Sequence, residues 1–455
     1  MSLKVVILAA GKGSRMRSSL PKVLQPLSSL PLLSHVVQTA NKLTDAEVTV
    51  VIGHGADKVR DEMRSFTALN FVEQLEQLGT GHAVKQADST YSDEDTVLVL
   101  YGDVPLTRPE TLQDLLGLVD EEHPLSVLTV TLANPTGYGR IIRDANHQVS
   151  SIVEEKDANV EQKLVKEVNT GIMAVSGVYL RKWLNDLSCD NAQTEYYLTD
   201  IISMCVADGK QVATTQPLDE IEVLGVNDKL QLHNLERAYQ KQQIAKLFEQ
   251  GVTIIDTSRL DIRGELKVGQ DVLIDVNCIF EGAVSLGNNV SIGANCIIKN
   301  SSIADNSVIQ PFSHVEEASV ATNCTIGPYA RLRPGSVLSA GVKIGNFVET
   351  KKVDIGKGSK INHLSYVGDT VMGEECNIGA GMITCNYDGV NKHKTNIGNH
   401  VFVGSASQLI APVSIGDNAT IGAGSTIVKN ADADKLTLSR SKQITIKGWS
   451  KPKKK

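Results

Sequence analysis

The second half of the chain carries an aliphatic residue at every sixth position. This period is neither the alternation of a half-buried strand nor the 3.6-residue period of a helix. When it is sustained over many repeats, with glycine after several aliphatic residues, it is typical of a solenoid of short parallel strands. A β-sandwich with coincidental spacing is the alternative, but such folds rarely keep one register over so many strands. The longest runs are Ile262, Val268, Ile274, Phe280, Leu286, Ile292 and Ile298, and then Ile397, Val403, Leu409, Ile415, Ile421 and Ile427.

Length and charge restrict the domain organisation and the partners. The chain has 455 residues, more than the roughly 250 to 300 that one hydrophobic core usually serves, so two or three domains are expected. The net charge of −7 gives no electrostatic footprint for nucleic acid. The apolar start, Leu3 to Ala10, is too short to span a bilayer and lacks the layout of a signal peptide. We therefore expect a buried strand there, with no membrane insertion.

The cysteines indicate a reducing compartment. There are seven of them, an odd number without a Cys-x-x-Cys pair, which argues against a disulfide framework or a zinc site and predicts a cytoplasmic location. Cys278 and Cys296 lie three hexads apart. If three hexads form one coil, these thiols stack on adjacent turns as small core residues rather than forming a bridge.

The pattern changes near Asn227. Before it, aliphatic runs alternate with helix-like segments, which predicts an α/β sheet with buried strands at 5–8, 48–52, 97–100 and 125–130. Residues 228–250 mix charged and apolar residues at helical spacing without Pro or Gly, and Gly251 follows. We therefore expect a first domain over 1–227, a linker helix over 228–250 and a second domain over 251–455.

A loop rich in small residues follows the first predicted strand. Its sequence from Leu8 is Leu-Ala-Ala-Gly-Lys-Gly-Ser-Arg-Met. Small residues let backbone amides approach a phosphate chain, and Lys12 and Arg15 could neutralise its charge. The loop lacks the third glycine of a dinucleotide fingerprint and the ending of a P-loop. A tight structural turn is the other interpretation of this segment.

Three further clusters favour a phosphate site. Pro21-Lys22-Val23-Leu24 adds a cation, residues 77–82 form a glycine-bearing loop ahead of a helix, and Asp103 ends a buried strand. Ligands bind at the carboxyl ends of strands in α/β sheets, and a carboxylate there suits Mg²⁺ bridging phosphates. The alternative is that Asp103, followed by Val-Pro, only starts a turn.

These motifs, with Gly79-Thr80-Gly81, Gly137-Tyr138-Gly139-Arg140, Glu154-Glu155-Lys156 and Asn169-Thr170-Gly171, resemble those of sugar-1-phosphate nucleotidyltransferases. The hexad repeat resembles that of left-handed β-helix acyltransferases. Together and in this order, they resemble the family of bacterial bifunctional N-acetylglucosamine-1-phosphate uridylyltransferases/glucosamine-1-phosphate N-acetyltransferases. The resemblance spans essentially the whole chain. It implies an α/β protein with an N-terminal Rossmann-like nucleotidyltransferase domain, a long linker helix and a C-terminal left-handed parallel β-helix.

For the first domain, the resemblance implies transfer of UMP from UTP to N-acetylglucosamine 1-phosphate, with release of pyrophosphate. It assigns a triphosphate-bracing catalytic role to Arg15 and implies Mg²⁺ held by Asp103 and Asn227. Ser29-Leu30-Pro31 departs from the Gly-Lys-Pro of many relatives, beyond the residues assigned to ligand. The implied nucleotide and sugar contacts are Leu8, Ala9, Ala10, Gly11, Lys22, Gln74, Gly79, Thr80, Tyr101, Gly102, Asp103, Gly139, Glu154, Asn169 and Asn227.

In the second domain, polar chemistry gathers where the hexad pattern breaks, at residues 346–352, 362–369 and 384–389. Loops that project from a rigid solenoid are where such folds carry function. Transfer of an acetyl group to a sugar amine needs a base, and a histidine titrates in the useful range. His363 is the candidate, because Glu349, Lys351 and Tyr366 accompany it. Cys385 as an acyl-carrying nucleophile is less favoured, because nothing nearby in sequence would lower its pKa or act as its base.

The resemblance makes His363 the general base and implies acetyl-CoA as co-substrate, with a site shared between subunits of a homotrimer. Both reactions would then make UDP-N-acetylglucosamine for synthesis of the bacterial cell envelope. The implied glucosamine 1-phosphate contacts are Arg333, Lys351, Tyr366, Asn377 and Lys392, and the implied acetyl-CoA contacts are Ala380, Asn386, Tyr387, Ser405, Ala423 and Arg440.

Two other interpretations remain. An enzyme that makes another nucleotide sugar, with a solenoid that only regulates it, would not need His363. A non-enzymatic assembly subunit would be expected to lose Arg15, Lys22 or Asp103, and the chain keeps all three.

Overall fold

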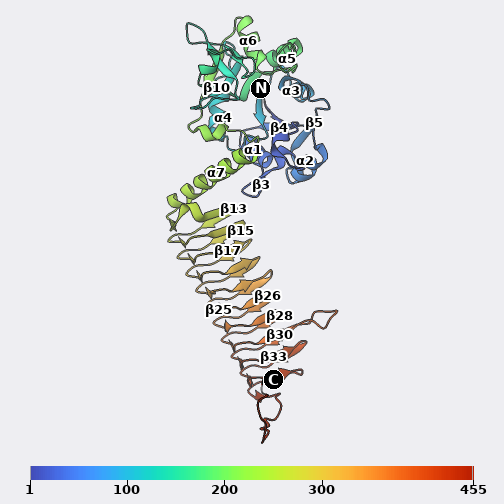
Figure 1. Cartoon of the computed structure of the whole chain (residues 1–455), viewed down its shortest axis with the longest axis vertical. Coiled ribbons are helices and arrows are strands. Elements are labelled where there is room, and N and C mark those ends of the chain that lie inside the picture. Colours follow the sequence, from blue (N-terminus) through green and yellow to red (C-terminus); the bar gives the residue numbers. More distant parts are fainter. Residues whose placement is uncertain (1, 453, 455) are drawn as a thin grey trace. The chain divides into compact units, whose positions relative to one another are not determined.

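The computed structural model describes residues 2–452 and 454. It divides into two compact units, the first running to Tyr239 and the second from Gln240 onward. Figure 1 shows the helices and strands of each unit.

A mixed sheet of nine strands forms the centre of the first unit. Its main path is β11-β7-β10-β6-β1-β4-β5, and β8 and β9 extend it from β10. The four predicted strands are confirmed, since they fall within β1, β4, β6 and β7. The strands are β1 (Leu3–Leu8), β4 (Ala46–Ile52), β5 (Leu69–Glu73), β6 (Thr96–Tyr101), β7 (Leu125–Thr131), β8 (Arg140–Arg143), β9 (Val149–Val153), β10 (Glu167–Ser176) and β11 (Val212–Thr215), and a separate two-stranded ribbon joins β2 (Pro26–Leu27) to β3 (Leu30–Pro31).

Helices cover both faces of this sheet, which explains why its central strands are almost continuously apolar. β1 pairs in parallel with β4 and β6, whereas β10 runs antiparallel to β6 and β7. The carboxyl ends of β1 and β6 therefore lie side by side. The helices are α1 (Leu32–Ala40), α2 (Ala56–Glu62), α3 (Thr80–Lys85), α4 (Pro109–Leu116), α5 (Gly177–Asp186) and α6 (Asp200–Ala207).

A long helix, α7 (Lys229–Glu249), follows the first unit's sheet. It lies within the 228–250 expected from the sequence. Near its start, Leu235 packs in a small core with Met16 and Val226. It ends ahead of Gly251, whose φ of +82° is the left-handed conformation that commonly terminates a helix.

The second unit is a parallel β-helix of stacked three-sided coils (Figure 1). An 11-stranded sheet forms one side of the coils. Its strands are β12 (Thr253–Ile254), β14 (Leu273–Ile274), β16 (Ser291–Ile292), β19 (Val308–Ile309), β22 (Thr325–Ile326), β25 (Lys343–Asn346), β27 (Lys360–His363), β29 (Asn377–Ile378), β32 (Phe402–Val403), β35 (Thr420–Ile421) and β37 (Leu436–Thr437).

A 15-stranded sheet bends around the other two sides. Its strands are β13 (Leu260–Val268), β15 (Cys278–Leu286), β17 (Ile297–Lys299), β18 (Ser302–Ile303), β20 (His314–Glu316), β21 (Ala318–Val320), β23 (Arg331–Leu332), β24 (Ser336–Leu338), β26 (Glu349–Ile355), β28 (Tyr366–Met372), β30 (Ile383–Cys385), β31 (Thr395–Ile397), β33 (Gln408–Ile410), β34 (Val413–Ile415) and β36 (Thr426–Ile427).

The predicted aliphatic stack fills the β-helix. Every residue of the two longest hexad runs is buried except Val268, which is half-buried and packs against the same core. Cys278 and Cys296 are confirmed as free, buried thiols, and burial raises their pKa values to about 12 and about 11. Neighbouring coils approach closely, so a Cβ on Gly345 would lie 2.0 Å from the backbone oxygen of Asn362.

Candidate functional sites

The first candidate site is a cavity of about 270 Å³ at the carboxyl ends of β1 and β6. This is the edge where a parallel α/β sheet binds ligands. The predicted residues lining it are Leu8, Ala9, Ala10, Gly11, Lys22, Gln74, Gly79, Thr80, Tyr101 and Asp103. Glu195, which sequence reasoning missed, also lines it, because a segment far along the chain folds back beside Gly79.

Main-chain hydrogen bonds fix the loop after β1. The amide of Ala9 donates to Val51 (2.8 Å), and that of Gly102 donates to the carbonyl of Leu8 (3.0 Å). A Cβ on Gly11 would meet nothing within 4 Å, so the space beside its Cα is open. Gly13 has a left-handed φ of +59°, and a Cβ there would lie 2.6 Å from that of Lys22. The second glycine of Gly-Lys-Gly therefore brings the loop against Lys22.

Two cations and two oxygen ligands converge at one end of this cavity. The Lys22 ammonium forms an ion pair with the Asp103 carboxylate and donates to the side-chain oxygen of Asn227 (3.2 Å). Arg15 donates to the same oxygen of Asn227 at 3.0 Å. The amide of Val226 donates to the carbonyl of Asp103 (3.0 Å) and holds the two segments together. The structure therefore brings together four residues that the sequence assigned to phosphate and metal.

These oxygens suit a hard divalent cation. Asp103 and Asn227 already share a cationic partner in Lys22. Mg²⁺ is usually held by one or two carboxylates together with substrate phosphates. Within residues 2–452 and 454, no group of three or more His, Cys, Asp or Glu side chains is placed to hold a metal ion. A metal at Asp103 and Asn227 would therefore need further ligands from the phosphates or from water.

The loop at 74–80 closes one wall of the cavity. Gln74 donates to the carbonyl of Gly79 (3.1 Å), and Thr80 accepts from the amide of Leu198 (3.1 Å). Gly79 has a φ of +114°, and a Cβ there would lie 2.6 Å from the carbonyl oxygen of Tyr196. Only glycine fits this close approach, which also carries Glu195 into the cavity.

A second group of predicted residues surrounds Tyr101. The amide of Asn169 donates to the carbonyl of Gly139 (2.9 Å), and Thr199 donates to the Glu154 carboxylate (3.1 Å). Burial raises the pKa of Glu154, and it also raises that of Tyr101, to which Glu154 and Asp103 contribute. These groups form a polar wall beside the Tyr101 ring.

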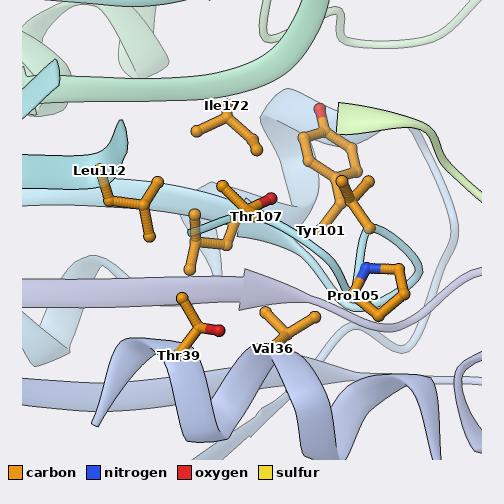
Figure 2. A pocket seen from close by; sticks show the side chains of 9 residues that line it. Val36, Thr39, Tyr101, Pro105, Thr107, Leu112 and Ile172 are labelled. Carbon is orange, nitrogen blue, oxygen red and sulfur yellow. The ribbon is translucent and has the colours of Figure 1, made fainter. Parts of the chain in front are cut away.

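A much smaller, closed cavity lies beneath the turn at Tyr101 and Pro105 (Figure 2). Its volume of about 10 Å³ barely allows one water molecule. Its lining is mostly apolar, so it is a packing gap beneath the turn rather than a ligand site. The side chains around it are Val36, Thr39, Leu100, Tyr101, Val104, Pro105, Thr107, Leu112 and Ile172.

In the second unit, one corner of the coils gathers His363 and most of the residues assigned to acetyl-CoA. At this corner the chain leaves the 11-stranded sheet and enters the first of the two sides formed by the 15-stranded sheet. Backbone hydrogen bonds join successive coils at this corner. The amide of Gly381 donates to the carbonyl of His363 (3.3 Å), that of Ala406 to the carbonyl of Ala380 (2.8 Å), and that of Gly424 to the carbonyl of Ser405 (2.8 Å). The stacked residues are His363, Ala380, Ser405, Ala423 and Arg440, whose Cδ would lie 3.7 Å from a Cβ on Gly424. Asn377 lies on β29, the strand that leads into this corner.

His363 has one side-chain partner among the described residues, and the sequence did not indicate it. Its Nδ1 lies 2.8 Å from the side-chain oxygen of Asn346 on the preceding coil. Both residues line a hollow of about 290 Å³, together with Lys343 and Asn362.

The next corner of the coils gathers the cations. Arg333 pairs with Glu349 at 2.7 Å. The pKa of Lys351 is lowered, chiefly by Lys392 and then by Arg333, so these three cations face one another. Like charges held together without enough counter-charge favour an anionic ligand. Glu349 also pairs in register with Tyr366, which places that ring on the same face.

A hairpin projects from this second corner (Figure 1). Tyr387 forms an antiparallel bridge with Lys392, and His393 pairs with Asp388 at 2.7 Å. At its base, Asn386 donates to the carboxylate of Asp369. The adjacent Cys385 thiol has a pKa raised by burial, which disfavours the thiolate that a nucleophile needs.

The two corner groups are not joined within one chain. Across the described part of the second unit, no hydrogen bond or ion pair links His363, Ala380, Ser405, Ala423 or Arg440 to the cations of the next corner. The structure thus separates residues that the sequence assigned to a single acetyl-transfer site.

No helix in the described parts of the chain is long and apolar enough to cross a membrane.

Both units match models of known protein families. The MobA-like NTP transferase domain matches residues 5–252. The GMPPB C-terminal domain matches residues 262–353, and the bacterial transferase hexapeptide repeat matches residues 394–429. Among solved structures, a UDP-glucose pyrophosphorylase complexed with UDP-glucose aligns over 53% of this chain and 100% of its own at 18% identity, with a TM-score of 0.43.

Curated relatives match the chain from end to end. The bifunctional protein GlmU of Hydrogenovibrio crunogenus is 66% identical over 454 residues, covering 100% of both chains. The bifunctional protein GlmU of Marinobacter nauticus is 56% identical over 452 residues, covering 99% of both. Because this likeness includes both units, the chain belongs to the GlmU family of bifunctional enzymes, with a nucleotidyltransferase followed by a hexapeptide-repeat acetyltransferase.

Proposed function

We propose that the chain makes UDP-N-acetylglucosamine from glucosamine 1-phosphate in two steps. Residues 251–455 transfer acetyl from acetyl-CoA to the sugar amine, and residues 1–227 then transfer UMP from UTP to the acetylated sugar phosphate. Residues 228–250 link the two domains. The observation that carries the proposal is the convergence of Lys22, Arg15, Asp103 and Asn227 at one end of a cavity, in a chain whose second unit gathers three cations at one corner of its coils.

In the nucleotidyl step, a phosphate oxygen of N-acetylglucosamine 1-phosphate attacks the α-phosphorus of UTP. The bond from that phosphorus to the β-phosphate bridging oxygen breaks, and pyrophosphate leaves with the bonding electron pair. Such a transfer needs positioning and charge neutralisation rather than a covalent nucleophile. Lys22 and Arg15 neutralise the triphosphate, and their shared contact with Asn227 keeps them aligned.

The metal of this step is Mg²⁺, held by Asp103 and Asn227. When bound, it neutralises charge on the phosphates that meet there. The ammonium of Lys22, which lies beside Asp103 and Asn227, would contact the phosphate chain next to the residues that would hold the metal. Leu8 through Gly11, Gln74, Gly79 and Thr80 hold the nucleotide, while Tyr101, Gly102, Gly139, Glu154 and Asn169 surround the sugar.

In the acetyl step, the amine nitrogen of glucosamine 1-phosphate attacks the thioester carbonyl of acetyl-CoA. His363 removes a proton from the amine, the carbon–sulfur bond breaks, and the sulfur leaves as the CoA thiolate and takes up a proton. Arg333, Lys351 and Lys392 bind the phosphate, with Tyr366 and Asn377 on the sugar. Ala380, Asn386, Tyr387, Ser405, Ala423 and Arg440 bind acetyl-CoA.

The acetyl-transfer site requires more than one copy of the chain. Because His363 and the cations lie at different corners of the coils, the corner of a neighbouring copy completes the site in a homotrimer. An exposed apolar column supports this arrangement. Phe312, Tyr329 and Phe347 stack at 4.8 and 5.2 Å and end next to His363 at Leu364.

The backbone of that column makes its composition unusual. All four residues have a left-handed φ, between 48° and 62°, a conformation that disfavours bulky side chains. The equivalent corners of other coils carry Asn295, Gly381 and Gly424. Large apolar side chains that are both strained and exposed are consistent with burial against a neighbouring copy.

A substrate-omission assay tests the function. Purified protein receives Mg²⁺, UTP, acetyl-CoA and glucosamine 1-phosphate while free thiol and pyrophosphate are followed together. Omitting acetyl-CoA should abolish both signals, and adding N-acetylglucosamine 1-phosphate should restore pyrophosphate alone. Pyrophosphate without thiol in the complete mixture would contradict the acetyl-transfer half of the proposal.

A further inference from the structure

The side-chain partner of His363 decides whether that residue can act as a base. A neutral imidazole carries its proton on either Nδ1 or Nε2, and the hydrogen bond made by one nitrogen determines which. The Nδ1 of His363 lies 2.8 Å from the side-chain oxygen of Asn346. An oxygen can only accept, so the proton of this bond lies on Nδ1. The Nε2 atom then carries the lone pair that takes up a proton.

The backbone holds Asn346 in place for this contact. Asn346 and His363 are register partners on adjacent coils, and the carbonyl of Asn346 accepts from the amide of Leu364 (3.0 Å). The neighbouring Gly345 permits the close approach, since a Cβ there would lie 2.0 Å from the carbonyl oxygen of Asn362. On the other side of Asn346, the Phe347 ring stacks on Tyr329. The backbone of Asn346 is therefore held beside His363 before any substrate binds.

The charges around this pair are few. Among the described residues lining the hollow that contains His363 and Asn346, Lys343 of β25 is the only Lys, Arg, Asp or Glu. Lys360 lies on the strand of His363 itself. Neither is an acceptor for Nδ1, so Asn346 is the group placed to choose the tautomer.

We propose that Asn346 is a positioning residue for acetyl transfer, which holds His363 in the Nδ1-protonated form with Nε2 free as the base. This inference rests on the proposed role of His363. Its neutral amide fixes the tautomer without placing a negative charge beside the imidazole. A carboxylate at the same position would fix the tautomer as well but would raise the pKa of the imidazole.

Three variants of the full-length protein separate these effects. Asn346→Leu removes the acceptor, and we expect kcat for acetyl transfer to fall about tenfold or more with little change in KM, since the ring loses its fixed tautomer. Asn346→Asp keeps an acceptor, so kcat should recover at high pH while the acidic limb of the kcat profile moves up by about one pH unit. Asn362→Asp is the matched control. It places the same charge in the hollow without a bond to Nδ1, and it should move the limb less.

Tautomer and folding are read separately. Nitrogen-15 NMR of histidine-labelled protein, with His363→Gln to assign the signal, should show a protonated Nδ1 in the wild type and a loss of that preference in Asn346→Leu. Pyrophosphate formation from N-acetylglucosamine 1-phosphate by the same variants reports on the intact chain. A protonated Nε2 in the wild type, or equal losses in the Leu and Asp variants without a pH shift, would overturn the inference. If His363→Gln kept full acetyl transfer, the proposed role of His363 would fail instead.

Discussion

Arg15 donates a hydrogen bond of 3.0 Å to the side-chain oxygen of Asn227, the same atom that accepts from Lys22 at 3.2 Å. The side-chain oxygen of Asn227 thus connects the loop after β1, the Lys22 ammonium and the segment that precedes α7. Asp103 completes the group through its ion pair with Lys22. This arrangement makes the nucleotidyl step sensitive to any change in these four side chains.

Replacing Asp103 by Asn removes the negative charge proposed to hold Mg²⁺ while keeping the side-chain shape. Uridylyl transfer should fall by about a hundredfold or more, because a positioned charge at the reacting phosphates is lost. Acetyl transfer should be unchanged, since its residues lie in the second unit. Glu73→Gln is the control, because Glu73 also ends a strand but pairs with Arg60 (2.6 Å) and does not line the cavity. Equal losses in both activities would indicate a folding defect.

Removal of divalent metal should separate the two reactions in the wild-type protein. Chelation is expected to stop pyrophosphate formation and to leave thiol release from acetyl-CoA intact, because the proposed acetyl step uses protein cations for its phosphate. Adding back Mg²⁺ should restore pyrophosphate formation. Thiol release that also depended on metal would contradict the assignment of Arg333, Lys351 and Lys392 to the phosphate.

Two adjacent glutamates should respond to pH in opposite ways. Burial raises the pKa of Glu154 above its value in the unfolded chain, so its charge destabilises the fold above that pKa and the penalty disappears as pH falls through it. Arg140 lowers the pKa of Glu155, whose stabilising effect is present above its unfolded pKa and is lost as pH falls through the folded one. At pH 7, Glu154→Gln should therefore raise Tm and Glu155→Gln should lower it, each by roughly 2 °C.

The same measurement at pH 4 provides the control. Both differences from the wild type should shrink there, because protonation removes the charges that the substitutions remove. Glu154→Gln should also raise the KM for N-acetylglucosamine 1-phosphate if the residue contacts the sugar. A lower Tm for Glu154→Gln at pH 7 would mean that Glu154 stabilises the fold through its bond to Thr199.

Lys351 should illustrate a conflict between stability and binding. Its pKa is lowered chiefly by Lys392 and also by Arg333, so its charge opposes folding below its folded pKa, and that opposition disappears as pH rises through it. Lys351→Met should leave Tm at pH 7 unchanged or higher, yet raise the KM for glucosamine 1-phosphate by about tenfold or more. Lys357→Met, a change of the same type elsewhere on the coil, should affect neither. A fall in Tm without a change in KM would assign Lys351 a structural role.

The exposed aromatic column should matter for assembly. Phe347→Asn introduces a residue that suits the left-handed corner, but it removes apolar surface next to Phe312 and Tyr329. Sedimentation should show a trimer for the wild type and smaller species for the variant, with acetyl transfer lost and uridylyl transfer kept. Asn295→Ser at the same corner of an earlier coil should remain trimeric. A wild type that sediments as a monomer with full acetyl transfer would contradict the shared site.

Sequence patterns predicted the buried core residues of both units better than the residues at their surfaces. Hexad spacing identifies the residues that point into a parallel β-helix, and the stack was observed nearly as expected. The loops at Gly11, Lys22, Gly79 and Asp103 were also predicted to meet, because strand ends in a parallel sheet share one edge. Five strands of the first sheet, β5 and β8 to β11, were not predicted, and neither was the direction of β10. This strand runs antiparallel within the sheet, and no local spacing specifies strand direction.

Contacts made across distant segments could not be predicted. Glu195 reaches the nucleotide cavity only because Tyr196 packs against Gly79, and neither residue carries a local signal of that contact. The bond from His363 to Asn346 depends on the register between coils, which varies with the length of each corner. The separation of His363 from the cations likewise requires knowing which corner each residue occupies.

A complementation experiment tests the central claim, that one chain carries two separate transfer sites acting in sequence. Asp103→Asn and His363→Gln proteins are each given glucosamine 1-phosphate, acetyl-CoA, UTP and Mg²⁺, alone and as an equal mixture, and UDP-N-acetylglucosamine is measured. We predict that neither variant alone forms the product at more than about a hundredth of the wild-type rate, and that the mixture forms it readily. A mixture that stays as inactive as its components, or a single variant with wild-type product formation, would contradict the account.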